Sequence, residues 1–218
     1  MKILAYGEDA LTLWAVSKRL SFILQKLNDP SSLSDCRIIF RPSFGRRGGE
    51  KSAQFGEFDF MILAKGALYL GESKWDRSSE RVHDGLLTFR EEQLLRHRLF
   101  KFYVEKWLSA EYESWQEFME RVRDGLVELG VPKPVAPINS LLAKNLTTLL
   151  GVIREHYHAN TPGLRNVLLY FHTGKHLDYV PKTAGSDFEI FEIIDINYSE
   201  IAVDKFIEFE LDMEPVNR

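Results

Sequence analysis

Two apolar segments separated by the dipeptide Lys65-Gly66 constrain the fold of this chain more than any other feature of its sequence. The segment FDFMILA precedes the dipeptide, and ALYLGESKW follows it. A glycine beside a polar residue favours a two-residue turn, so the sequence predicts a β-hairpin in which Ala64 pairs with Ala67. Continued outward, this register places Asp59 opposite Glu72.

The predicted hairpin gathers four polar side chains at its open end. Glu57 falls opposite Lys74 in the same register, and side chains two residues apart on a strand share a face of the sheet. Asp59 and Glu72 would repel each other unless a cation lies between them. The group offers oxygen donors without histidine or cysteine, which suits Mg²⁺ or Mn²⁺ better than zinc. We therefore expect a site that binds one of these ions.

The chemistry of each group indicates its role at such a site. Asp59 and Glu72 are candidate metal ligands, and the main-chain carbonyl of Ser73 is a further candidate. Lys74 could orient or deprotonate a water molecule, or bind a phosphate oxygen. Glu57 either pairs with Lys74 or supports the metal indirectly. The alternative is a solvated surface on which Glu57 and Lys74 form an ordinary cross-strand ion pair.

Hydrophobic periodicity and chain-breaking residues predict the remaining elements. NVLLYFH is almost continuously apolar, as in a strand that is buried on both faces. KILAY fits a short strand or a lead-in to the first helix, and IAVDKFIEFELDM fits a strand or a helix. Together the elements indicate an α/β fold with helices flanking a mixed central sheet. The expected helices lie at about 9–27, 84–108, 110–129 and from Asn139 or Ser140 to about 158, and further strands at CRIIFRP, NVLLYFH and DFEIFEIIDI.

The order of these elements predicts a single domain over residues 1–218. Its core would comprise about 7–108 and 164–196, interrupted by a helical insertion at about 109–163. Such a long crossover suits a return to parallel strand pairing. An acidic C-terminal extension would cover about 187–218.

Composition and charge exclude several classes of protein. Hydrophobic residues make up 44% of the 218 residues, which is enough for a sizeable core. The net charge of −4 gives no global nucleic-acid signature, but the segment 187–218 carries ten acidic and two basic residues, which leaves a net +4 for the rest. Cys36 is the single cysteine, so an internal disulfide and a thiolate cluster are excluded. With neither a signal peptide nor a membrane span in the sequence, we expect a soluble, cytoplasmic protein.

The spacing of Asp59 from Glu72-Ser73-Lys74 resembles the D–x(n)–(D/E)xK signature of the PD-(D/E)xK nuclease superfamily, which includes restriction endonucleases. The core of that superfamily is a helix, a three-strand meander, a helix and a further strand (αβββαβ). The predicted order of elements from about Gly7 to Thr173 is similar. Phe58 stands where proline is common in the family. The resemblance implies a restriction-endonuclease-like core with Mg²⁺ or Mn²⁺ as cofactor.

The resemblance also implies roles for individual residues. Asp59 and Glu72 would bind the metal, and Lys74 would assist the attacking water. Glu8, with Asp9 as the second choice, is the candidate for an acid supplied by the first helix. Gln93, Glu92 and Arg96 are the candidates for a polar residue on the helix after the third strand. The implied activity is metal-dependent hydrolysis of phosphodiester bonds in DNA, as in restriction, repair or defence nucleases.

Basic residues on both sides of the hairpin are candidate contacts with the DNA backbone, because phosphate contacts supply most of the affinity for nucleic acid. The same residues fit a solvated surface equally well. The basic residues of the helix expected at 84–108 are assigned to a solvated face. The candidate contacts are Arg46, Arg47, Lys51, Arg77 and Arg81, and the solvated helix residues are Arg96, Arg98 and Lys101.

Other functions on the same fold stay open at this stage. A non-catalytic nucleic-acid-binding or protein-docking module would retain the fold and lose the chemistry, and a hydrolase of smaller phosphoesters would not need the basic loop. A homodimer would bring together two sites for cutting both strands of DNA. The acidic segment 187–218 is the candidate surface for a protein partner.

Overall fold

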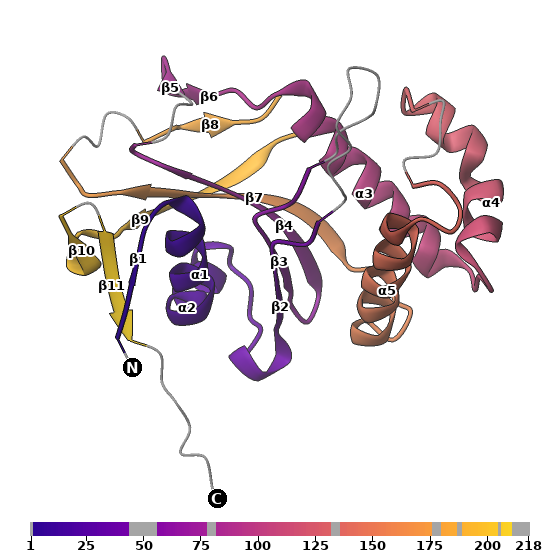
Figure 1. Cartoon of the computed structure of the whole chain (residues 1–218), viewed down its shortest axis with the longest axis horizontal. Helices are drawn as coiled ribbons and strands as arrows, with labels where there is room; N and C mark the ends of the chain where they lie inside the picture. Colours follow the sequence, from indigo (N-terminus) through magenta and orange to yellow (C-terminus); the bar gives the residue numbers. More distant parts are fainter. Residues whose placement is uncertain are drawn as a thin grey trace, which may run out of the picture.

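The computed structural model describes residues 2–43, 56–77, 82–131, 136–175, 180–186, 189–204 and 206–210. Within these residues the protein is a mixed α/β structure with five helices and three sheets. Figure 1 shows the largest sheet at the centre, with helices on both of its faces. None of the described helices is long and apolar enough to cross a membrane.

The central sheet has five strands in the order β2-β3-β4-β7-β9. The first three form an antiparallel meander, and the last two run parallel to β4. The order of helix, three strands, helices and returning parallel strand therefore follows the sequence-based expectation. The strands are β2 (Arg37–Phe40), β3 (Phe60–Leu63), β4 (Ala67–Trp75), β7 (Gly163–His172) and β9 (Phe191–Asn197).

The predicted register of the hairpin is confirmed from the turn to the pair Phe60–Gly71. The amide of Ala64 donates to the carbonyl of Ala67 over 2.9 Å, which closes the turn at Lys65-Gly66. Beyond Phe60 the ladder ends, because the amide of Asp59 also donates to the carbonyl of Gly71, over 3.0 Å.

The expected pairing of Glu57 with Lys74 across the hairpin is therefore wrong. The segment that precedes β3 is no longer paired with β4 before Asp59. Glu57 instead forms an antiparallel bridge with Ser43, beyond the end of β2. The register that the turn imposes is correct only as far as the chain remains a regular strand.

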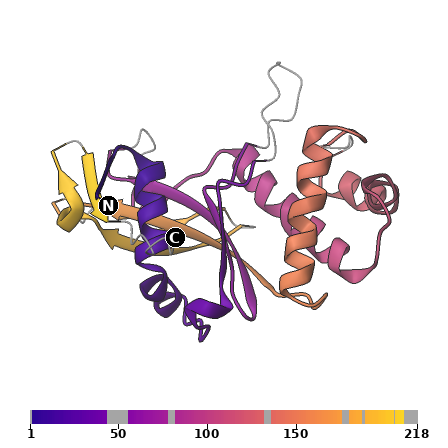
Figure 2. The ribbon, with the colours of Figure 1, turned by 60° about the horizontal axis from the view of Figure 1, so that its bottom comes forward.

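Helices cover both faces of the central sheet (Figures 1 and 2). One face packs against α1 and α2, and the other against α3 and α5, while α4 packs on the outside of these two helices. Along β4, Leu68 and Leu70 contact the α3 side and Tyr69 the α1 side, so strand alternation turns Glu72 toward α3. The helices are α1 (Glu8–Lys18), α2 (Leu20–Lys26), α3 (Glu91–Ser109), α4 (Trp115–Glu128) and α5 (Leu141–His156).

Three predicted helix boundaries are wrong. The helix expected at 110–129 begins five residues later, at Trp115, as α4. The helix expected at 9–27 is interrupted at Arg19, whose φ of −120° and ψ of 14° separate α1 from α2. The helix expected from residue 84 begins seven residues later, since Asp84 and Gly85 both have positive φ, at 52° and 79°. Consecutive positive φ values are typical of a hairpin turn of the Asp-Gly type. That turn joins the short strands β5 (Val82–His83) and β6 (Leu86–Leu87), and β6 pairs in parallel with β8 (Thr183–Ala184).

The alternatives at the two ends of the chain both resolve as strands. KILAY contains β1 (Lys2–Ala5), and the last segment contains β10 (Ala202–Val203) and β11 (Phe206–Glu210). They form a three-stranded sheet in the order β1-β11-β10, and Ile207 and Phe209 pack into the same core as α1. The acidic segment thus contributes β9 to the central sheet and two strands to a second one. The 3₁₀ turns are Leu33–Asp35 and Ser199–Ile201.

Close packing at Gly71 gives a test of the hairpin. The Cβ of an alanine at this position would lie 2.2 Å from ring atoms of Phe60, which cannot move freely in the core. We expect Gly71→Ala to lower the free energy of unfolding by about 3 kcal/mol, as overpacking does. Gly151→Ala is the matched control, because its Cβ would meet nothing within 4 Å and alanine favours the helix α5 by roughly 0.5–1 kcal/mol. Urea denaturation of both variants would measure the difference, and equal stabilities would contradict the packing.

Candidate functional site

The first residue of the candidate site is Asp59, which directly precedes β3. It lies where the pairing between β3 and β4 ends. Its Oδ2 accepts a hydrogen bond from the amide of Ser73 over 2.7 Å. Burial and then the nearby Glu72 carboxylate raise the pKa of Asp59 to about 7, against the opposing effects of the Ser73 amide and the Lys74 ammonium. In a strand the N–H and C=O of one residue point to the same side, so the carbonyl of Ser73 also faces Asp59.

Glu72 is the second carboxylate of the site, and its charge is neutralised in a different way. It is only 2% exposed, and Oε1 accepts hydrogen bonds from the guanidinium of Arg96 and from Nε2 of His97. Oε2 accepts a longer bond of 3.3 Å from Gln93. Burial alone would raise the pKa of Glu72, but the hydrogen bond from His97 and the charge of Arg96 outweigh it, so the pKa lies below the usual range.

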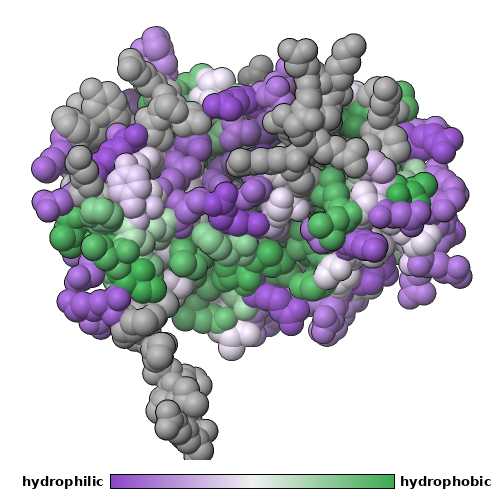
Figure 3. Space-filling view, viewed as in Figure 1, coloured by the Kyte–Doolittle hydropathy of each residue, from purple (hydrophilic) through white to green (hydrophobic). Residues whose placement is uncertain are grey.

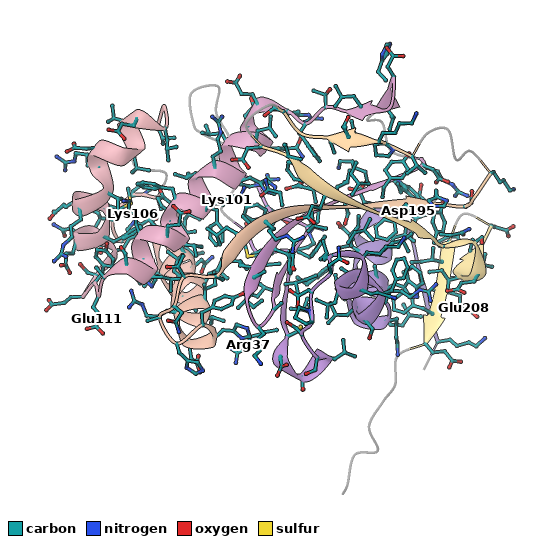
Figure 4. All side chains as sticks on the ribbon, turned by 180° about the vertical axis from the view of Figure 1, so that it is seen from behind. Arg37, Lys101, Lys106, Glu111, Asp195 and Glu208 are labelled. Carbon is teal, nitrogen blue, oxygen red and sulfur yellow. The ribbon has the colours of Figure 1, made fainter. Side chains whose placement is uncertain are left out.

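His97 connects Glu72 to a chain of buried polar groups. Its Nε2 lies 2.9 Å from Oε1 of Glu72, and its Nδ1 lies 2.9 Å from Oδ1 of Asn166 on β7. The amide nitrogen of Asn166 donates to Glu189 over 2.6 Å, which turns its oxygen toward the imidazole. Both ring nitrogens of His97 thus lie within hydrogen-bond distance of oxygen atoms. Lys101 of α3, labelled in Figure 4, completes the chain with a 2.8 Å bond to Glu189.

The third functional group, Lys74, lies beside the first turn of α1. Its ammonium nitrogen is 3.2 Å from Oε1 of Glu8. Glu8 and Asp9 form the acidic first turn of α1, where carboxylates are favoured by the helix dipole. The structure therefore brings Glu8 to Lys74, while Glu57 makes its ion pair with Arg41, at 2.8 Å.

The other predicted residues divide into three groups. Gln93 lies next to Glu72, as predicted for a polar residue on the helix after the third strand. Arg77 is exposed at the end of β4, where its guanidinium lies 5.7 Å from the ring centroid of Trp75. Arg46, Arg47, Lys51 and Arg81 lie outside the described residues.

Sequence reasoning missed His97 as part of the site. Arg96 was offered both as a polar residue beside the site and as part of a solvated helix face; it is 7% exposed, and His97 is fully buried. A signal was available, because Gln93, Arg96 and His97 lie three and four residues apart and share one face of α3. That spacing does not, however, predict that all three side chains contact Glu72.

The donor atoms at this site suit a hard divalent cation. No group of three or more His, Cys, Asp or Glu side chains in the described part of the chain is arranged to hold a metal ion. Two carboxylates and one carbonyl, from Asp59, Glu72 and Ser73, nevertheless converge as an oxygen-only set. Burial and the neighbouring Glu72 carboxylate disfavour the charged form of Asp59, and a cation at this position would offset that effect. These residues therefore fit Mg²⁺ or Mn²⁺.

Comparison of the chain with models of known protein families gave no match, and comparisons with curated proteins and with solved structures gave none either.

The raised pKa of Asp59 predicts how the stability of the metal-free protein depends on pH. An acid with a folded pKa of about 7 and an unfolded pKa near 4 destabilises the fold increasingly as pH rises between these values. We expect Asp59→Asn to remove this dependence while its side-chain oxygen still accepts from Ser73. In EDTA, thermal melting should show a higher Tm for the variant at pH 8, and a smaller difference at pH 4.

Asp29→Asn serves as the control of opposite sign. Although burial acts to raise the pKa of Asp29, the hydrogen bonds from Ser31 and Tyr69 lower it below its usual value. Its contribution to stability is present above pH 4 and is lost as pH falls further, so this variant should have a lower Tm than the parent at pH 8. An Asp59→Asn protein less stable than the parent at pH 8 would contradict the assignment.

The buried contacts of His97 predict a large loss of stability on its removal. His97→Leu removes one buried hydrogen-bond partner of Glu72 and also the ring contact of the Asn166 oxygen. Removing a partner of a buried charge in this way costs about 3–5 kcal/mol of unfolding free energy, which urea denaturation would measure. His156→Leu is the control, since the hydrogen bond of that ring to the Ala64 carbonyl is long, at 3.4 Å, and its loss should cost under about 1 kcal/mol. Similar losses in the two variants would contradict the network.

Proposed function

We propose that this protein is a metal-dependent nuclease that hydrolyses phosphodiester bonds in DNA. The observation that carries the proposal is the convergence of Asp59, Glu72 and Lys74 at the open end of the hairpin, joined there by Glu8 from α1. Two carboxylates, a carbonyl and an ammonium group at one point are the set that the PD-(D/E)xK resemblance implies.

The arrangement of the central sheet supports the same proposal. The chain forms the helix α1, then the antiparallel meander β2-β3-β4, then the helix α3. The strand β7 follows and pairs in parallel with β4. This order matches the αβββαβ core that the resemblance implies, with α4 and α5 between α3 and β7 and with β9 at the edge of the sheet. The acidic residues lie on the second and third strands of the meander or directly beside them, as in that core.

The residues of the site would divide the work as follows. Asp59, Oε2 of Glu72 and the carbonyl of Ser73 would hold Mg²⁺ or Mn²⁺. When bound, the ion would polarise the phosphate and make a bound water more acidic. Lys74, held by Glu8, would donate to a phosphate oxygen or orient the attacking water.

Arg96 and His97 would act on the reaction only through Glu72. By holding Oε1 they leave Oε2, the oxygen with the longer contact to Gln93, to face the cation. The carboxylate is thereby fixed in one orientation and kept ionised, which is what a metal ligand requires.

A second candidate function follows from the same contacts. Because Arg96 and His97 already neutralise Glu72, the carboxylate is stable without a metal. That observation favours a non-catalytic nucleic-acid-binding module with the same fold. Such a module would bind DNA in a salt-sensitive manner that survives the loss of Asp59.

Cleavage assays distinguish these two functions. Plasmid, linear, single-stranded and branched DNA would be incubated with the protein and Mg²⁺ or Mn²⁺, in parallel with Asp59→Ala and Lys74→Ala. We expect metal-dependent cleavage by the parent, and a loss on the order of 10²-fold or more in each variant.

Lys65→Ala is the matched control for Lys74→Ala, because Lys65 lies at the exposed turn at the other end of the same hairpin. It should cleave like the parent protein. Full activity in Asp59→Ala would refute the nuclease, whereas DNA binding without cleavage by any form would favour the second candidate.

A further inference from the structure

We propose that an exposed aromatic surface beside the candidate site binds unpaired bases, so that the substrate is single-stranded or carries a single-stranded segment. We call this surface, formed by Tyr6, Trp75, Arg77 and Phe206, the aromatic platform. The inference deepens the proposed function and rests on it for the link to cleavage. Base binding by the platform can be tested separately.

Two rings of the platform, those of Tyr6 and Phe206, are exposed to solvent, and Trp75 is partly buried against the core. Tyr6 is 61% and Phe206 is 45% exposed. The ring centroid of Tyr6 lies 5.8 Å from that of Trp75 and 6.0 Å from that of Phe206, with interplanar angles of 86° and 67°. Pairing of Ala5 with Ile207 between β1 and β11 places Tyr6 and Phe206 side by side. Large exposed aromatic side chains in a contiguous group are an informative feature of a surface.

Further exposed apolar side chains adjoin the platform. Leu4 and Val203, 58% and 46% exposed, extend it over the small sheet, where Figure 3 shows a hydrophobic area at the lower left. The acidic neighbour Glu208 is paired with Lys2 at 2.8 Å. Within the described residues, Arg77 makes no ion pair, so its guanidinium is available beside the Trp75 ring. The platform therefore offers aromatic faces together with one cation.

The platform is continuous with the candidate site along two segments of chain. Tyr6 precedes Glu8 by two residues, a span of at most about 7 Å in extended chain, and Trp75 directly follows Lys74. The ion pair of Glu8 with Lys74 joins these segments. A nucleic-acid strand held at the site would thus reach the platform with its next residues.

Aromatic faces beside an arginine match the chemistry of nucleobases. Every base has a π-face that stacks on aromatic side chains whatever the sequence, and arginine adds cation–π and phosphate contacts. In a duplex these faces are covered by neighbouring base pairs, so only an unpaired base can stack on Tyr6 or Phe206. A protein partner would use the same surface as a hydrophobic patch, without a requirement for aromatic rings.

Binding of labelled oligonucleotides to the full chain carrying Asp59→Asn, in EDTA, tests this inference without cleavage. Fluorescence anisotropy would compare oligothymidylate, oligouridylate and a blunt DNA duplex of equal length. We expect tighter binding of the single strands than of the duplex. Tyr6→Leu and Phe206→Leu should weaken single-strand binding by about 5- to 100-fold each and leave duplex binding unchanged.

Variants that retain an aromatic ring distinguish a loss of base stacking from a loss of hydrophobic contact or of folding. Tyr6→Phe and Phe206→Tyr retain the rings and should bind like the parent, while leucine retains only the apolar volume. Leu141→Ala is the control for loss of an exposed apolar side chain elsewhere, since Leu141 is 74% exposed at the start of α5. The platform lies far from the helices α3 and α4: Figure 4 shows Glu208, near the platform, at one end of the molecule and Glu111, between α3 and α4, at the other.

Two outcomes would overturn the inference. One is single-strand binding no tighter than duplex binding, and the other is leucine variants that bind like the ring-retaining variants. If either occurs while the parent still cleaves DNA with metal, the platform is wrong and the proposed nuclease stands. If single-strand binding depends on Tyr6 and Phe206 but the parent cleaves nothing, the platform stands and the nuclease is refuted.

Discussion

The buried carboxylate of Glu72 is the group on which the rest of this structure depends. It lies on β4, a strand that is buried over almost its whole length, and an unpaired charge there would cost several kcal/mol. Arg96 and His97 supply the compensation, so α3 must dock with one particular face toward the sheet. Through His97 the same requirement reaches Asn166 on β7 and Glu189 before β9. One charge thus fixes the relative positions of a helix and three neighbouring parts of the sheet.

The pKa values of the two carboxylates of the site are shifted in opposite directions. Glu72 is surrounded by donors and remains ionised, whereas burial and the charge of Glu72 hold the pKa of Asp59 near neutrality, at about 7. A site built only for stability would have given Asp59 a cation or replaced it with an uncharged residue. Retention of a poorly compensated acid next to a fixed anion is typical of functional sites. This asymmetry is the physical basis for preferring a cation-binding site over a structural polar cluster.

The parts of the fold that sequence predicted correctly depend on local interactions. The turn at Lys65-Gly66 determines the register up to Phe60, and Ser140 caps α5 through the amide of Ala143, as its type and place indicate. The errors begin where a distant contact overrides the local pattern. Glu57 leaves the hairpin because its carboxylate binds Arg41, sixteen residues earlier.

The same limit applies to the candidate site. Asp59, Glu72 and Lys74 are predictable because one hairpin holds all three. Arg96 looks like a solvated helix residue in sequence, since its burial depends on how α3 docks against a strand 24 residues away. The Asp-Gly turn at 84–85, in contrast, is a local signal that was open to sequence reasoning and would have corrected the start of α3.

A single glycine connects the platform to the site. Gly7 has φ of 91° and ψ of 178°, a conformation that residues with a Cβ rarely adopt, and it separates Tyr6 from Glu8. The turn at Gly7 lets consecutive parts of one segment point in different directions, with the ring of Tyr6 toward solvent and the carboxylate of Glu8 toward Lys74. A side chain at this position would strain the backbone and displace both groups together. The surface proposed to bind bases and the site proposed to cut the backbone are therefore positioned by the same local geometry.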